Sequence, residues 1–391
     1  MGTPRFLQVH TLHSFPAALI NRDDSGLAKR MPFGGVIRTR ISSQCLKRHW
    51  RLAQDEYSIH SIAGTKGAYR SRNIVERQVM GPLATVKGVS EEVLKAVGEA
   101  FNVGIYGSNG TTEAGRQALL LGLPEVEYLQ EKAEAIVTEY PKDVEAARVA
   151  AAELFGSTRG ESQNFRAFRA SAVLPGGLEG ALFGRMVTSD PAANIDAAIH
   201  VAHAFTVHPE ESENDYFSAV DDLAGEEEYA VAAHIGDMEL TAGLFYGYVV
   251  VDVPGLVSNL EGCPAEAWLS ADRNLAAQVI HNLLHLIATI SPGAKLGSTA
   301  PYGRARFMLV EAGTCQPYSL ADAFRRPARA QLEDALDRLS MEITAQDENY
   351  GRKGIRRFMS LEDCAISGAE RLALADLAQW AAGVVRAGEA K

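Results

Sequence analysis

The residues best suited to chemistry in this chain are cations clustered near its amino end. Residues 25–54 contain seven Lys or Arg side chains and no Asp or Glu. Arg offers forked donors and Lys a compact charge, and both bind phosphate oxygens well. Because no acids neighbour them, these cations indicate contacts with the sugar-phosphate backbone of a nucleic acid, contacts that carry no sequence information.

A helix over residues 43–57 would align most of these cations. Ser42 or Ser43 is a natural N-cap, so unpaired N–H groups and the positive end of the helix dipole meet there and form a phosphate site. At 3.6 residues per turn, one face carries the donors Gln44, Lys47, Arg48 and Arg51, and the opposite face carries Leu46, Trp50 and Ala53. The donor row continues onto Arg38 and Arg40 of the preceding strand. The alternative is a solvated amphipathic helix whose basic residues cluster without a ligand.

Two further features could touch nucleic acid. Met186 lies in the short basic segment 184–189, and an apolar side chain of that shape can wedge between bases, although a Met more often fills a gap in a core. The aromatic run 243–250 resembles the aromatic strand of RNA-recognition motifs, but an ordinary half-buried strand explains it equally well.

Enzymatic alternatives find weaker support. His281 and His285 lie four residues apart without the acid of a zinc-protease motif, so we interpret them as core histidines. Asp23 and Asp24 beside Arg22 could support metal-assisted RNA cleavage, but a turn explains the same residues. No nucleotide-binding or hydrolase motif occurs, and the four cysteines lack CxxC spacing. We predict no catalysis, no metal and no cofactor.

The expected elements suggest an α+β fold. Strands are expected at 6–12, 36–40, 243–253 and 305–310, and helices at 43–57, 275–290 and after residues 334 and 370. This order is typical of an interrupted ferredoxin-like βαββαβ core. The interruption over about 60–182 shows helical patterning at 91–101, 126–140 and 144–155. We therefore expect a palm from 1–59 and 183–391 and a helical insertion at 60–182.

The net charge of −11 does not oppose nucleic-acid binding, because the acids are concentrated elsewhere. Residues 209–228 hold nine acids and no Lys or Arg, within a polar stretch at about 205–237 that we expect to project as a loop. No run of about 18 apolar residues and no signal-peptide pattern occurs, so we expect a cytoplasmic protein without a membrane partner.

Several segments together resemble one known family. They are Phe-Leu-Gln-Val-His-Thr-Leu (6–12), Asn-Arg-Asp-Asp (21–24), Phe-Gly-Gly-Val (33–36), Arg-Ile-Ser-Ser-Gln-Cys-Leu-Lys-Arg (40–48), and, downstream in the same order, 184–186, 196–208, 215–222, 291–295 and 319–324. The order is similar to that of the CasC family of the Cas-seven superfamily, the backbone subunit of the type I-E CRISPR Cascade complex. The resemblance covers most of the chain and is weakest in the helical insertion and the C-terminal tail.

This resemblance implies a right-hand-like subunit with an RRM-type palm, helical fingers and a projecting thumb. Six copies would line a CRISPR guide RNA, kink it periodically and present it to target DNA, together with other Cascade subunits. The residues implied to grip the RNA backbone are Arg22, Lys29, Ser42, Gln44, Lys47, Arg48 and Arg51, with Arg329 as a further basic contact and Met186 near a kink. Lys295 matches a motif without an assigned role. Related type III backbone subunits cut RNA with a loop Asp, so cleavage through Asp23 or Asp24 is the alternative function.

Overall fold

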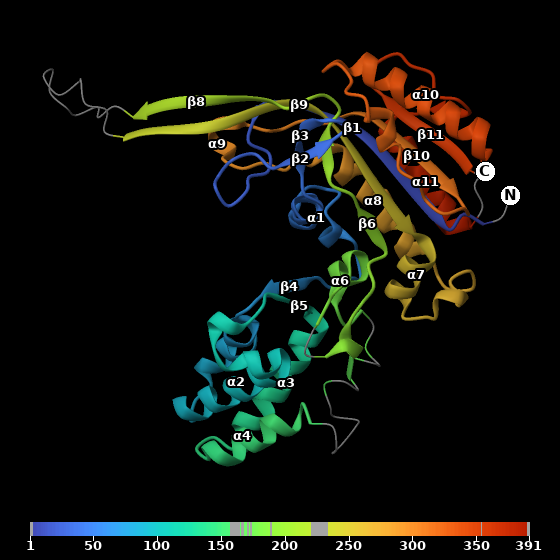
Figure 1. Cartoon of the computed structure of the whole chain (residues 1–391). Helices are drawn as coiled ribbons and strands as arrows, with labels where there is room; N and C mark the ends of the chain where they lie inside the picture. The colour runs from blue at the N-terminus through green and yellow to red at the C-terminus, as the bar shows by residue number, and fades with distance from the viewer. Residues whose placement is uncertain are drawn as a thin grey trace, which may run out of the picture. The chain divides into compact units, whose positions relative to one another are not determined.

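The computed structural model describes residues 3–156, 165, 168–169, 172, 174–187, 190–219, 234–352 and 354–388. The chain forms two compact units (Figure 1). The first unit contains residues 1–61, 200–253 and 274–391, and the second contains residues 62–199 and 254–273. Among the described residues, no helix combines the length and the apolar composition that a bilayer crossing requires.

A large, mostly antiparallel sheet organises the first unit. Its strand order is β12-β11-β10-β1-β9-β7-β3-β2, and β6 and β8 also pair with β9. The strands are β1 (Phe6–Ala18), β2 (Arg30–Phe33), β3 (Val36–Ile41), β6 (Ile199–Val201), β7 (Ala204–Thr206), β8 (Glu211–Ala219), β9 (His234–Asp252), β10 (Ala305–Gly313), β11 (Gly354–Ser360) and β12 (Ala369–Arg371). Central β1 pairs with β9 and β10 along most of its length, which explains why six consecutive residues, 7–12, are buried.

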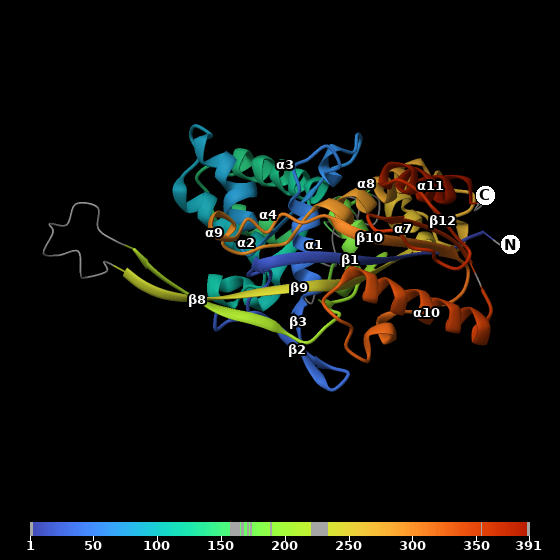
Figure 2. The ribbon, with the colours of Figure 1, turned by 90° about the horizontal axis from the view of Figure 1, so that it is seen from above.

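Helices cover both faces of this sheet, and Figure 2 shows the strands lying between them. On one face lie α1 (Ser43–Leu52), α8 (Asn274–Thr289) and α11 (Leu374–Ala387), and on the other lies α10 (Leu332–Tyr350). Alternation along β1 separates the two cores, because neighbouring strand residues point to opposite faces. His13 meets the carbonyl of Ile287 on α8, whereas Leu12 belongs to the core that contains Leu339 of α10.

The hairpin of β8 and β9 extends beyond the rest of the sheet (Figure 1). Its register runs from Glu211 opposite Ala242 to Ala219 opposite His234. Part of the acidic stretch at 209–228, and of the expected loop at 205–237, lies outside the described residues. Within the described part, acids of β8 alternate with neutral residues on a two-stranded ribbon.

The second unit is mainly helical. It contains α2 (Glu91–Tyr106), α3 (Leu123–Glu139), α4 (Val144–Glu153), α6 (Gly177–Phe183), α7 (Val253–Glu261) and a small sheet of β4 (Ala68–Ser71) and β5 (Leu119–Gly122). Its core is built around Val97 and Phe101 of α2, Leu129 and Val137 of α3, and Ala147 of α4. Expected helices at 91–101, 126–140 and 144–155 are therefore present.

The mixed α/β character expected from the sequence is confirmed, but α1 is shorter than predicted. It ends at Leu52 and not near residue 57. Ala53 leaves the helical region at φ −57° and ψ 142°, and the ring nitrogen Nε2 of His60 hydrogen-bonds the carbonyl of Arg51 at 3.0 Å. The Asp55 carboxylate then accepts the amide of Tyr57 in a turn. These local hydrogen bonds replace those that would continue the helix.

Candidate nucleic-acid interface

The N-terminus of α1 is capped as the sequence predicts. Ser42 is the N-cap, and its hydroxyl accepts the amide of Cys45 at 3.3 Å. The backbone amide of Ser42 in turn donates to Oδ1 of Asn21 at 2.9 Å. The first turn contains no acid, so the positive end of the helix dipole is not neutralised within the helix. A phosphate approaching this end would meet backbone donors and basic side chains together.

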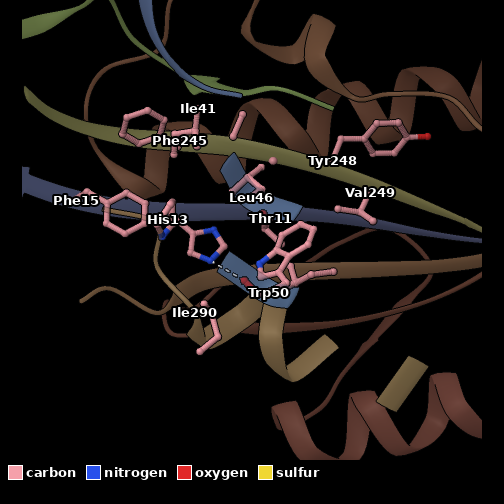
Figure 3. Close-up of a pocket in the computed structure, with 14 residues that line it drawn as sticks. Thr11, His13, Phe15, Ile41, Leu46, Trp50, Phe245, Tyr248, Val249 and Ile290 are labelled. Carbon is pink, nitrogen blue, oxygen red and sulfur yellow. Dashed lines mark hydrogen bonds between the residues drawn. The ribbon is translucent and has the colours of Figure 1, made fainter. Parts of the chain in front are cut away.

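The opposite face of α1 explains why its donors point outward. Leu46 and Trp50 line a small, mostly apolar pocket between α1 and β1, together with His13 and Phe15 (Figure 3). Burial lowers the pKa of His13 to about 4, so this ring adds no charge beneath the helix at neutral pH. With the apolar side fixed, Gln44 and Arg48 are exposed.

Lys47 and Arg51 lie on the same side of α1 and are half-buried. A 3.6-residue period places them beside Gln44 and Arg48, in the row that the sequence predicts. We call the set Arg22, Lys29, Arg40, Ser42, Gln44, Lys47, Arg48 and Arg51 the cationic rim. Its members come from the loop before β2, from β3 and from α1, all within the first unit.

Backbone hydrogen bonds hold the parts of the cationic rim together. The amide of Lys29 donates to the carbonyl of Asn21, and the amide of Arg40 donates to the carbonyl of Lys29 at 2.8 Å. The Arg40 guanidinium donates to the carbonyl of Arg30 at 3.1 Å and lies 3.1 Å from Nδ1 of His203. The loop, the strand and the helix start are thus positioned by the same few residues.

Arg38 is not part of this surface, contrary to the sequence-based expectation. Its side chain is 0% exposed and donates to the carbonyls of Phe33, Thr206 and Phe324. Desolvation lowers the pKa of Arg38 from its usual value. Because its donors are used inside the protein, Arg38 joins β3 to two distant segments and does not meet a ligand.

Arg30, unlike Arg38, is paired with acids, which sequence reasoning missed. Glu239 of β9 is buried, accepts the amide of Ala28 at 2.6 Å and pairs with the Arg30 guanidinium. Glu210 forms a second ion pair with Arg30. These acids lie about two hundred residues away in the chain, so no local pattern could reveal them.

The loop that carries Arg22 is shaped by Asp23. One carboxylate oxygen of Asp23 accepts the amides of Ser25 at 2.9 Å and Leu27 at 3.0 Å. This is the turn that an Asn-Arg-Asp-Asp segment favours. Arg22 and Asp24 are exposed on it. Across the described residues, no three His, Cys, Asp or Glu side chains are grouped to hold a metal ion.

Met186 belongs to the second unit and is displayed on an anchored segment. Its side chain is 72% exposed, whereas its neighbours Arg185 and Val187 are buried. Backbone hydrogen bonds join Arg185 and Ile195 in both directions, and the Arg185 guanidinium donates to the buried Glu125 carboxylate at 2.6 Å. Met186 is therefore a surface side chain and not a core gap-filler.

Arg329 lies in the first unit, just before α10, and is exposed. Its backbone amide donates to the Asp334 carboxylate at 2.8 Å, and the same carboxylate accepts from Arg338. The hydrogen bond from the Arg329 amide is the main cause of the lowered pKa of Asp334. The local backbone is thus fixed around Arg329.

Comparison with known proteins identifies the family. The family model described as CT1975-like protein (Cas_CT1975) matches residues 7–382. A solved chain titled "CRISPR RNA-guided surveillance complex, pre-nicking" is 25% identical, with a TM-score of 0.76 over 98% of this chain and 100% of that chain. Another, titled "CRISPR RNA-guided surveillance complex", is 20% identical with a TM-score of 0.57 and the same coverage, and shows similarity of fold alone. No curated protein matches the chain. Because the family model spans nearly the whole sequence, the chain belongs to the CT1975-like protein family.

Proposed function

We propose that this chain is a non-catalytic backbone subunit of a CRISPR surveillance complex of the type I-E CasC kind, which binds guide RNA. In this proposal the first unit is an RRM-like palm, the second unit supplies helical fingers, and the β8–β9 hairpin is the base of a thumb. Family membership and the likeness to a chain of an RNA-guided complex support the proposal.

The observation that carries the proposal is the cationic rim. It brings basic side chains from three elements around the capped start of α1. Donors of this kind suit ribose-phosphate and read no bases, so target recognition would come from pairing of the guide. The half-buried Glu210 and the buried Glu239 both pair with Arg30.

Repetition along the guide follows from the same chemistry. A surface that binds backbone without reading bases can bind any stretch of the guide, so several copies can line one RNA. The exposed Met186, on its anchored segment, would contact the guide where it kinks. Target DNA, further copies of the chain (six in the family) and other Cascade subunits are the proposed partners.

The test is RNA retention by a double variant of α1. Lys47→Glu with Arg48→Glu places two negative charges in the cationic rim, and we expect co-purified RNA of discrete length to disappear while the chain stays folded. Arg352→Glu with Arg386→Glu makes the same change in net charge at exposed positions outside the rim and should retain the RNA. Equal RNA content in both variants would refute the proposed surface.

The alternative is metal-dependent cleavage of RNA through Asp23 or Asp24. The Asp23 carboxylate already accepts two amides of its own turn, which favours a structural role. Incubation of the chain with labelled RNA and Mg²⁺ or Mn²⁺ separates the two functions. Turnover that disappears in Asp24→Ala, a substitution that leaves the Asp23 turn intact, would establish the alternative.

A further inference from the structure

A second site lies on the α10 face of the first unit, opposite the face that α1 covers. A pocket of about 450 Å³ is lined there by residues of β1, β10, β11, the loop after β10 and the end of α10. This volume is in the range of pockets that bind small organic ligands. None of the residues of the cationic rim lines it.

The charged groups of the pocket wall are already paired with each other. Arg356 donates to both oxygens of Asp347, at 2.6 and 2.9 Å, and pairs with Glu311. Glu311 also accepts from Nε2 of His10 at 3.1 Å. Glu311 and Arg356 are buried, so an ionic ligand would have to break these pairs at a high cost. The wall therefore favours a neutral ligand.

Gln8 provides the polar anchor. Its Oε1 accepts the hydroxyl of Tyr248 at 2.7 Å and the backbone amide of Tyr318 at 2.8 Å. A backbone amide can only donate, so the orientation of the Gln8 carboxamide is determined. Gln8 is only 8% exposed. Its Nε2 group has no hydrogen-bond partner among the described residues. A ligand that accepts a hydrogen bond would satisfy this donor.

The remaining lining favours a flat ligand. Two tyrosines line the pocket, Tyr318 and, at the end of α10, Tyr350, which is 73% exposed. Gly313, Gly351 and Gly354 line it with backbone alone, which allows close approach. A planar ring can lie against these surfaces and stack on Tyr350.

We infer that this pocket binds a neutral heteroaromatic ring bearing a hydrogen-bond acceptor, the chemistry of a nucleobase or of nicotinamide. Gln8 donates to the acceptor, and Tyr350 stacks on the ring. The base could belong to a free nucleoside or to an RNA strand. This inference goes beyond the proposed function, because it uses neither α1 nor any residue of the cationic rim.

The test is titration of the RNA-free full chain with adenosine, cytidine and nicotinamide, followed by saturation-transfer NMR and calorimetry. We expect at least one probe to bind. Gln8→Glu keeps the acceptor oxygen for Tyr248 and Tyr318 but removes the donor, and should weaken binding roughly tenfold. Tyr350→Ala should weaken it similarly, whereas Tyr350→Phe keeps the ring and should bind as the wild type does.

A short RNA oligonucleotide added to the probe complex distinguishes the two sources of the base. If the RNA displaces the probe from the wild type, and this displacement requires Tyr350, the pocket binds a base within a strand. If the probe stays bound in the presence of RNA, the pocket binds a free ligand. The inference fails if no probe binds at millimolar concentration, or if Gln8→Glu and Tyr350→Ala bind as the wild type does. Should Gln8→Glu misfold, the comparison of probe binding by Tyr350→Ala and Tyr350→Phe still tests the inference, because Tyr350 is exposed. Lys47→Glu with Arg48→Glu should leave probe binding unchanged, so failure here is distinct from failure of the RNA proposal.

Discussion

The two faces of the first unit's sheet use charge in opposite ways. On the α1 face, the cationic rim presents basic side chains at the surface around an uncompensated helix N-terminus. On the α10 face, the buried His10, Glu311 and Arg356 and the half-buried Asp347 form a network in which each ion meets a partner. The same residue type thus serves two purposes, and desolvation decides which. A buried guanidinium must have its N–H donors satisfied inside the protein, by carboxylates for Arg356 and by carbonyls for Arg38, whereas an exposed one can meet phosphate.

The largest effect should come from opening the buried network. Arg356→Met leaves Glu311 and Asp347 without their cation, and we expect the free energy of unfolding to fall by about 3–5 kcal/mol, measured by urea denaturation. Arg306→Ala is the matched control, because its ion pair with Glu362 is partly exposed to solvent and should be worth at most about 1 kcal/mol. Similar losses in both variants would erase the distinction between buried and exposed charge.

Lowering the pH should weaken the same network, because it protonates the Glu311 carboxylate. Burial alone would raise the pKa of this carboxyl, but hydrogen bonds from His10 and Arg356 outweigh it and lower the pKa from 4.5 to about 2. A lowered pKa means that the stabilisation is complete above the unfolded value and is lost as pH falls from about 4.5 to 2. The stability difference between wild type and Glu311→Gln should shrink by about 3 kcal/mol over this window. A difference that does not change with pH would contradict the ionised pair.

On the α1 face, a single cation should change binding without changing stability. Arg48→Ala should weaken RNA binding about tenfold at low salt and reduce the slope of log affinity against log salt by about 0.7, because one phosphate contact is lost. The urea midpoint should stay within error of the wild type, since Arg48 is exposed. Arg386→Ala, at an exposed position of α11, is the control and should keep both affinity and slope.

The smallest effect should come from the cap of α1. Ser42→Ala removes the acceptor of the Cys45 amide and should cost about 1 kcal/mol of stability. Ser42→Thr keeps a hydroxyl and should recover most of it. If Ser42 acts on RNA only through the helix start, affinity should fall while the salt slope stays constant. A reduced slope would instead show that the helix start also positions a cationic phosphate contact, because a neutral hydroxyl releases no counterion itself.

Local features of the candidate site could be predicted from the sequence. The serine cap and the 3.6-residue period of α1 involve residues within ten positions of one another, and both are confirmed. The roles of Arg30 and Arg38 could not be predicted, because their partners, such as Glu239 and Phe324, lie more than two hundred residues away. Composition shows that cations are abundant, but only the fold shows which ones are neutralised.

The fold, like the site, has features that the sequence predicts locally and features that depend on distant contacts. Helices of the second unit and the main strands of the first follow from periodicity, and the mixed α/β character follows from their order. No local pattern indicates that residues 254–273 join the second unit, or that His10, Glu311 and Arg356 meet across three neighbouring strands. The buried network depends on the pairing of β1 with β10, between positions about three hundred residues apart, and on the pairing of β10 with β11, and only the observed register reveals both.

Asn21 connects two parts of the α1 face that the chain separates by a whole hairpin. Its side-chain oxygen accepts the amide of Ser42, and its carbonyl accepts the amide of Lys29. One residue therefore fixes the distance between the loop's positive charges and those of the helix. If the cationic rim binds RNA as proposed, these two hydrogen bonds of Asn21 set the spacing at which the loop and the helix present their charges to successive phosphates.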